Sequence, residues 1–162
     1  MATKGKNLSS FSLTDFENCS EYRIGIVVSE WNKEITKNLF EGAKDTLLQV
    51  GIPSKNISTQ WVPGAFELPL GAQAMLESLS LDGIIAIGVV IQGETKHFDY
   101  VCSGTTQGIM DVMLKYNRPI SFCVLTDNNL QQSIDRSGGK HGNKGIEAAV
   151  ACLKMIQFRN SL

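Results

Sequence analysis

Four side chains of different chemistry follow one another in the middle of the chain: a carboxylate, a hydroxyl, an ammonium and an imidazole, which are Glu94, Thr95, Lys96 and His97. An imidazole donates and accepts protons near neutral pH, so His97 is a candidate acid/base group. Apolar residues return at helical spacing directly after this segment, which predicts that a helix begins here. Because the free N–H groups at a helix N-terminus favour an anion, the segment predicts an anion site beside a proton-transfer group.

These side chains need an element that holds them in place, and the residues before them provide one. The apolar run 84–91 stops at Gln92-Gly93, as expected for a buried strand that ends in a polar turn. Ligands of open α/β sheets bind at this edge, outside the carboxyl ends of the strands. Three further predicted strand ends carry polar or aromatic clusters: Ser29–Asn32, Pro63–Glu67 and Thr126–Asn128, with Phe122 just before the last. In a parallel sheet all four clusters would meet at one edge.

Two aromatic residues and one acid in these clusters suit a flat, polar substrate. Trp31 and Phe66 could stack on a ring, and Glu67 could bind hydroxyl or amine groups. Each also has an ordinary structural explanation, because a Trp in a turn often anchors packing, a Phe belongs to the core by default, and an early helical Glu complements the helix dipole. A single histidine at a helix start is commonly solvated. Their shared location at strand ends favours a site.

Strands and helices alternate along the chain. Apolar runs predict strands over 23–29, 58–62, 83–91 and 120–125. Helical spacing predicts helices over about 32–50, 67–79, 98–116, 128–136 and 146–158, with Asn32 as the N-cap of the first and 138–145 as a loop. The predicted fold is α/β: a single-domain, flavodoxin-like, three-layer αβα arrangement with a mostly parallel four-stranded sheet. Gly104 and Gly108, inside a helix, predict close packing of its backbone, with another subunit as one candidate partner.

The composition narrows the classes of function. The chain has 162 residues, which is enough for one domain. We assign this domain to residues 23–162. Residues 1–22 form a polar segment that we expect to be mobile or docked on a neighbouring subunit. The net charge of −1 gives no electrostatic footprint for nucleic acid. No apolar run approaches the ~20 residues of a membrane span. Four widely spaced cysteines fit a reducing, cytoplasmic location, and the two histidines do not suit a multi-histidine metal site.

Several residue blocks together resemble the 6,7-dimethyl-8-ribityllumazine synthase family. They are VVSEWN (27–32), WVPGAFELPL (61–70), GVVIQGETKHFDYV (88–101), FCVLT (122–126) and IDRSGGKHGNKG (134–145). The second and third blocks in this order are highly specific, and the resemblance extends over 23–158. It implies a transferase that condenses 5-amino-6-(D-ribitylamino)uracil with 3,4-dihydroxy-2-butanone 4-phosphate in the penultimate step of riboflavin biosynthesis, releasing phosphate and water. It implies no metal and no cofactor.

The resemblance also implies roles for individual residues. His97 matches the proposed proton donor. The positions implied to bind the ribitylaminouracil are Trp31, Ala65, Phe66, Glu67, Val89, Val90, Ile91 and, from the adjacent subunit, Phe122. Those implied to bind the butanone phosphate are Glu94, Thr95 and, from the adjacent subunit, Arg136. Lys140, in the same basic loop as Arg136, and Asn32 are further candidates.

Members of the family form pentamers, in some cases assembled into a sixty-subunit icosahedral shell, and the compact segment 137–145 allows that shell here. Riboflavin synthase is an implied candidate partner. Three other interpretations explain fewer residues. A flavin- or nucleotide-binding flavodoxin-like module without turnover leaves Arg136 and Lys140 unexplained, and the turn at Gly93 fits neither GxGxxG nor the Walker pattern. An inactive structural shell protein does not need this set of polar residues, and a phosphate-accepting His97 has no partner acid or metal cluster.

Overall fold

In the computed structural model, which describes residues 11–16 and 18–162, four strands form one sheet in the order β2-β1-β3-β4. The strands are β1 (Ile24–Ser29), β2 (Ile57–Val62), β3 (Gly83–Ile91) and β4 (Ile120–Asp127). Each neighbouring pair runs parallel. The predicted α/β fold with a parallel four-stranded sheet is therefore confirmed.

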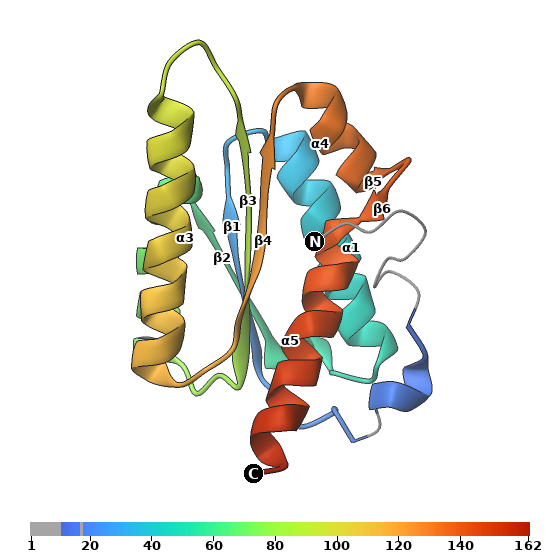
Figure 1. Ribbon diagram of the computed structural model, residues 1–162. Coiled ribbons are helices and arrows are strands. Elements are labelled where there is room, and N and C mark those ends of the chain that lie inside the picture. The colour runs from blue at the N-terminus through green and yellow to red at the C-terminus, as the bar shows by residue number, and fades with distance from the viewer. Residues whose placement is uncertain (1–10, 17) are drawn as a thin grey trace.

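Helices cover both faces of this sheet (Figure 1). Their bounds are α1 (Lys33–Gln49), α2 (Leu68–Ser78), α3 (His97–Tyr116), α4 (Leu130–Arg136) and α5 (Lys144–Asn160). Helices α2 and α3 pack on one face, and α1 and α5 on the other, so the three-layer arrangement is confirmed. Short 3₁₀ helices lie at η1 (Leu13–Phe16), η2 (Ser54–Asn56) and η3 (Ala65–Glu67).

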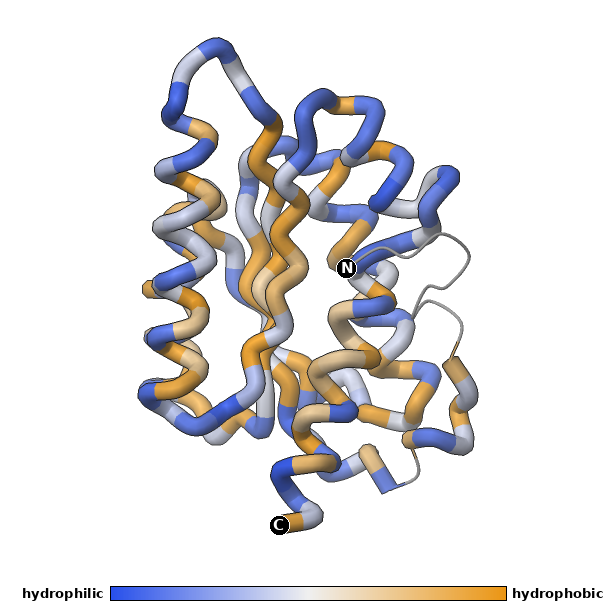
Figure 2. Tube along the Cα trace, in the orientation of Figure 1, coloured by the Kyte–Doolittle hydropathy of each residue, from blue (hydrophilic) through white to orange (hydrophobic). Residues whose placement is uncertain are grey.

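The central strands are buried on both faces. Every residue of β1 is buried, and successive side chains enter opposite layers: Ile26 joins the cluster with α1 and α5, whereas Val27 joins the cluster with α2 and α3. Figure 2 shows the strands as a hydrophobic band, with hydrophilic turns above their ends. Leu153 of α5 and Leu68 of α2 are fully buried against the two faces. The sheet is thus a rigid platform whose carboxyl edge carries the polar turns.

The glycine-rich segment after α4 differs from the prediction. Residues 138–145 were predicted as an irregular loop, but the chain forms a short antiparallel ribbon there, of β5 (Ser137–Gly139) and β6 (Gly142–Asn143). Gly138 and Gly142 have φ values of 125° and 72°, a left-handed backbone that favours glycine and lets the chain reverse tightly. The ribbon fixes the direction in which the chain enters α5.

Two predicted helix starts also need correction. Asn32 precedes α1 as predicted, but its side chain makes no capping hydrogen bond; its φ of 54° and ψ of 51° are left-handed, which asparagine tolerates better than most residues. The helix predicted from 128 begins at Leu130, because the side chain of Asn129 accepts a hydrogen bond from Gln132 N and caps it.

The segment before β1 packs on the same chain where it is described. Phe16 and Cys19 are buried in the cluster with α1 and α5. Residues 1–10 and 17 lie outside the described residues, so the assignment of 1–22 to a mobile or neighbour-docked segment stays a prediction. In the part of the chain that the structure describes, no helix is both long enough and apolar enough to cross a membrane.

Candidate active site

The strand order switches direction between β1 and β3, and at such a point the carboxyl ends of the strands of open α/β sheets form a crevice for ligands; we call this expected position the crevice. The chain leaves β1 toward β2 on one side and β3 lies on the other, which is the point where open α/β sheets bind ligands. Trp31 follows β1, and the turn of residues 92–96 follows β3 and leads to His97, the first residue of α3. This turn is the hydrophilic loop at the top left of Figure 2. The two sequence features with the clearest chemistry therefore flank one crevice.

Trp31 and Glu67 come together around Gly64. A Cβ atom on Gly64 would lie 3.0 Å from Glu67 Oε2 and 3.4 Å from Trp31 Cδ1. The backbone holds the two loops together, because Trp31 N donates a hydrogen bond of 3.3 Å to the oxygen of Pro63. The Trp31 side chain is 71% exposed and Phe66 is 60% exposed. We call Trp31, Phe66 and Glu67 the stacking surface, because its aromatic faces are open to a flat ligand.

Helix α3 holds the segment that carries Phe66. Thr105 Oγ1 donates a buried hydrogen bond of 3.1 Å to the backbone oxygen of Ala65. A Cβ atom on Gly104 would lie 2.7 Å from Phe66 Cε2, so the ring rests on the bare helix backbone. Gly108 makes the corresponding contact with Pro69, since a Cβ atom there would lie 2.7 Å from the Pro69 Cγ. The close packing predicted at both glycines is present, and its partners in the structure belong to the same chain.

The end of β3 offers free backbone groups to the crevice. Strand β1 pairs with β3 only as far as Val28 opposite Ile87, whereas β3 continues to Ile91 and stays paired with β4 alone. The last residues of β3, Val89 to Ile91, thus have backbone groups without a strand partner on the β1 side. Such N–H and C=O groups can read the polar edge of a ring. Gly88, the residue before them, packs against Ala65: a Cβ atom on Gly88 would lie 3.4 Å from the Cβ atom of Ala65.

The turn between β3 and α3 is open and locally ordered. Gln92 N donates a hydrogen bond of 2.9 Å to the backbone oxygen of Asp127, which ties the start of the turn to β4. Thr95 Oγ1 accepts a hydrogen bond of 3.3 Å from His97 N. A Cβ atom on Gly93 would meet no other atom within 4 Å. Glu94 and His97 are exposed, so a ligand in the crevice can reach them.

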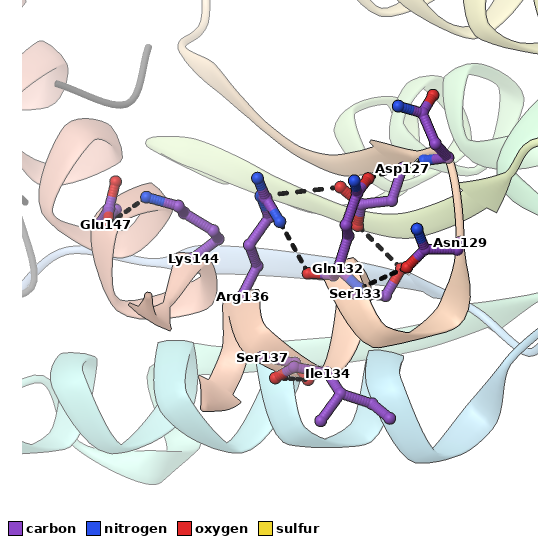
Figure 3. A network of polar contacts seen from close by, with 10 residues as sticks. Asp127, Asn129, Gln132, Ser133, Ile134, Arg136, Ser137, Lys144 and Glu147 are labelled. Atoms are coloured by element: carbon purple, nitrogen blue, oxygen red, sulfur yellow. Dashed lines mark hydrogen bonds and ion pairs between the residues drawn. The ribbon is translucent and has the colours of Figure 1, made fainter. Parts of the chain in front are cut away.

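Phe122 and Arg136 lie elsewhere, in a groove of about 520 Å³ along β4, the strand at the edge of the sheet. We call this cavity the β4 groove. Two ion pairs line it (Figure 3): Arg136 Nε lies 3.6 Å from Asp127 Oδ1, and Lys144 Nζ lies 2.6 Å from Glu147 Oε1. Burial raises the pKa of Cys123, which also lines the groove, to about 12, so its thiol is neutral and a weak nucleophile.

The predicted site residues thus fall into two groups: those at or after the ends of β1, β2 and β3, and those in the β4 groove. Neighbouring strands lie about 4.8 Å apart, so β4 is roughly 10 Å from β1 and roughly 14 Å from β2. The first group is the stacking surface with Ala65, Val89, Val90, Ile91, Glu94, Thr95 and His97; the second is Phe122 and Arg136. Asn32 follows Trp31, and Lys140 is exposed between β5 and β6, outside the lining of the β4 groove.

Sequence reasoning missed three groove residues. Asp127 belonged to a predicted strand-end cluster but was given no role, and Lys144 and Glu147 were not considered. The signal that could have found the last two is their spacing, since a Lys and a Glu three positions apart face each other on a helix. In the described residues, no group of three or more His, Cys, Asp and Glu side chains could hold a metal ion.

Several known proteins are similar to this chain over nearly its whole length. A sequence model described as 6,7-dimethyl-8-ribityllumazine synthase matches residues 21–160. A protein of that name from Christiangramia forsetii is 56% identical over 160 residues, which cover 98% of this chain and 95% of the relative. Those from Flavobacterium johnsoniae and Parabacteroides distasonis are 55% and 51% identical, covering 98% of this chain and 84% and 99% of the relatives. The likeness extends over both groups of site residues.

Proposed function

The chain belongs to the 6,7-dimethyl-8-ribityllumazine synthase family, and we propose that the stacking surface and the β4 groove are the two halves of an active site shared by neighbouring copies. The reaction condenses 5-amino-6-(D-ribitylamino)uracil with 3,4-dihydroxy-2-butanone 4-phosphate and releases phosphate and water, a transferase step of riboflavin biosynthesis. The observation that supports a shared site is the separation of Phe122 and Arg136 from Trp31 and Glu67 by a full strand.

The stacking surface suits the ribitylaminouracil. Trp31 offers an exposed ring face for the pyrimidine, and Glu67 lies close enough to accept hydrogen bonds from hydroxyl groups of the ribityl chain. The backbone of Val89 to Ile91, which has no strand partner on the β1 side, can read the polar edge of the ring. Phe122 of a neighbouring copy would close the site on its other side.

The phosphate needs fixed donors, and two elements supply them. One is the turn with Glu94 and Thr95, where the N-terminus of the following helix α3 contributes a partial positive charge. The other is the Arg136 guanidinium of a neighbouring copy, which can bind two phosphate oxygens at once. Lys140 could add a further positive charge.

The chemistry uses the nucleophilicity that the substrate amine already has. The amine attacks the ketone to give a carbinolamine, and loss of water gives an imine. Phosphate leaves by elimination, and ring closure expels a second water. Each step moves a proton between nitrogen, carbon and oxygen, which His97 at the mouth of the crevice can donate or accept. Much of the acceleration comes from holding two reactants together.

Replacing His97 by alanine should therefore reduce the rate only moderately. We expect kcat to fall by about tenfold to a hundredfold, at or below the low end of general acid–base effects, because substrate positioning remains. The KM of each substrate should change less. The measurement is the steady-state formation of the fluorescent lumazine. His141→Ala, at an exposed position between β5 and β6, is the matched control and should keep the wild-type rate. A His97→Ala enzyme with wild-type kcat would contradict the role of His97.

Gly104 should control the binding of the ribitylaminouracil through Phe66. In Gly104→Ala, the new methyl group would lie 2.7 Å from Phe66 Cε2 and push the ring outward. We expect the KM for the ribitylaminouracil to rise by about three- to tenfold, with little change for the phosphate substrate. Gly108→Ala adds the same methyl group to the same helix but meets Pro69, so it should leave this KM near the wild-type value. Equal constants for both variants would refute the role of Phe66.

The proposed assembly is a pentamer, with the sixty-subunit shell as a further assembly that the compact ribbon of residues 137–145 allows. Sedimentation that finds only a monomer in an active preparation would exclude the shared site. We also propose riboflavin synthase as a partner and the cytoplasm as the location, since four cysteines spaced far apart in the sequence fit a reducing compartment.

A further inference from the structure

Asp127, the last residue of β4, is a buried carboxylate held by side chains of the following helix (Figure 3). Its side chain is 7% exposed. Ser133 Oγ donates a hydrogen bond of 2.8 Å to Asp127 Oδ2, and Arg136 Nε lies 3.6 Å from Asp127 Oδ1. Both partners belong to α4. One carboxylate oxygen is thus fixed by a hydroxyl, and the other faces a guanidinium.

The Arg136 guanidinium is held on two sides. Its Nε side faces Asp127, and Nη1 donates a hydrogen bond of 2.9 Å to the backbone oxygen of Gln132. A guanidinium has five N–H donors in a rigid plane, so three of them remain for a ligand. The Arg136 side chain is 30% exposed, in contact with the β4 groove. The two contacts therefore decide which edge of the guanidinium plane faces the groove.

Stability alone is a weak reason for such a pair. Burying a carboxylate carries a large desolvation cost, and replacing a buried ion pair by apolar residues is often neutral or stabilising. The Asp127 charge also offsets part of the positive charge that would attract an anion to Arg136. If anion affinity were the only requirement, a neutral residue at position 127 would allow tighter binding of the anion. What the carboxylate supplies is a fixed orientation of the guanidinium.

We propose that Asp127, held by Ser133, is a positioning residue for Arg136, turning the free Nη edge of the guanidinium toward the phosphate of the butanone substrate. This inference rests on the proposed phosphate role of Arg136. Without Asp127 the long Arg136 side chain can adopt other rotamers, and bidentate binding then requires ordering it at each binding event. Asp127 itself does not touch the substrate.

Steady-state kinetics of Asp127→Asn tests this proposal, because the amide keeps the shape of the carboxylate and removes its charge. We expect the KM for the butanone phosphate to rise by about tenfold, with kcat within about twofold and the KM for the ribitylaminouracil unchanged. Ser133→Ala, which frees one carboxylate oxygen, should raise the same KM by about threefold. An unchanged or lower KM for the phosphate substrate in Asp127→Asn would overturn the proposal, since a lower value would show that the carboxylate only weakens anion binding.

Asp135→Asn is the matched control, because it removes the same charge from the residue next to Arg136. Asp135 accepts a hydrogen bond of 2.9 Å from Gln131 Nε2 and makes no ion pair with Arg136. Its KM values should equal those of the wild type; a rise as large as that of Asp127→Asn would mean that the effect does not depend on the contact between Asp127 and Arg136, and would overturn the proposal.

A double variant separates this inference from the role of Arg136. If Asp127 acts through Arg136, then Asp127→Asn should have no further effect on the phosphate KM in an Arg136→Ala background. An additional tenfold rise there would overturn the positioning role. An Arg136→Ala enzyme with a wild-type phosphate KM would instead refute the proposed role of Arg136 itself.

Discussion

Replacing Arg136 by alanine is expected to raise the KM for the butanone phosphate by about 30- to 100-fold, the largest kinetic effect of any single substitution considered for this site. A hydrogen bond to a charged group contributes about 1.5–3 kcal/mol, and a bidentate guanidinium–phosphate contact lies at the upper end of that range. The KM for the ribitylaminouracil should change much less, because Arg136 lies in the β4 groove and not at the stacking surface. Initial rates measured with each substrate varied in turn distinguish the two effects.

The same variant can show whether the site is shared. His97→Ala and Arg136→Ala subunits, each poorly active alone, should recover activity when they are dissociated and reassembled together. A site that takes His97 from one copy and Arg136 from the next is intact in about a quarter of the positions of a random mixture. If mixed assemblies are no more active than the average of the two variants, both residues act within one chain.

Gly145→Ala should cause the largest loss of stability, about 3–5 kcal/mol in the free energy of unfolding or failure to fold. A Cβ atom on Gly145 would overlap the carbonyl oxygen of Leu39 and lie 2.7 Å from its carbon. This obstacle is backbone of α1, which cannot turn aside as a side chain can. Helices α1 and α5 would have to separate, exposing buried residues such as Leu153. Urea-induced unfolding followed by circular dichroism measures the loss.

Gly93→Ala is the control for this prediction. It is the same substitution, but the new Cβ would meet no other atom within 4 Å, so the free energy of unfolding should change by less than about 0.5 kcal/mol. Because Gly93 lies in the phosphate-side turn, only its stability is compared. Similar unfolding midpoints for the two variants would show that α1 and α5 are not packed as closely as the structure has them.

The sheet could be predicted from the sequence because its signals are local. The apolar run 84–91 and the short run 24–28 are long enough for strands and too short for helices, and polar residues follow each of them. The ribbon after α4 could not be predicted, because its turn depends on positive φ angles at Gly138 and Gly142. A glycine in a sequence permits such an angle but does not show that the chain adopts it. Asn32 shows the same limit. Asparagine is common both as a side-chain cap of a helix and in a left-handed backbone, so the sequence could not show which of the two applies before α1.

The candidate site could be proposed from the sequence where its residues follow one another, and less so where distant segments meet. Glu94 to His97 were proposed as site residues from their order alone. The contact between Phe66 and Gly104 joins two elements, so the sequence indicated that something packs on the glycine but not what it is. The positions of Asp127 and Arg136 depend on how α4 returns along the edge of the sheet, which no local pattern specifies.

The separation of the stacking surface from the β4 groove also limits how copies can associate. A two-fold dimer could complete two such sites only if each copy presented both the stacking surface and the β4 groove within one self-complementary patch, whereas a contact that joins one patch to a different patch of the next copy is head-to-tail. Such head-to-tail contacts continue from copy to copy until the rotation closes. An open row would always leave an unused stacking surface at one end and an unused β4 groove at the other. Among head-to-tail assemblies, only a closed ring gives every subunit a complete site, so activity per subunit then reports ring closure directly.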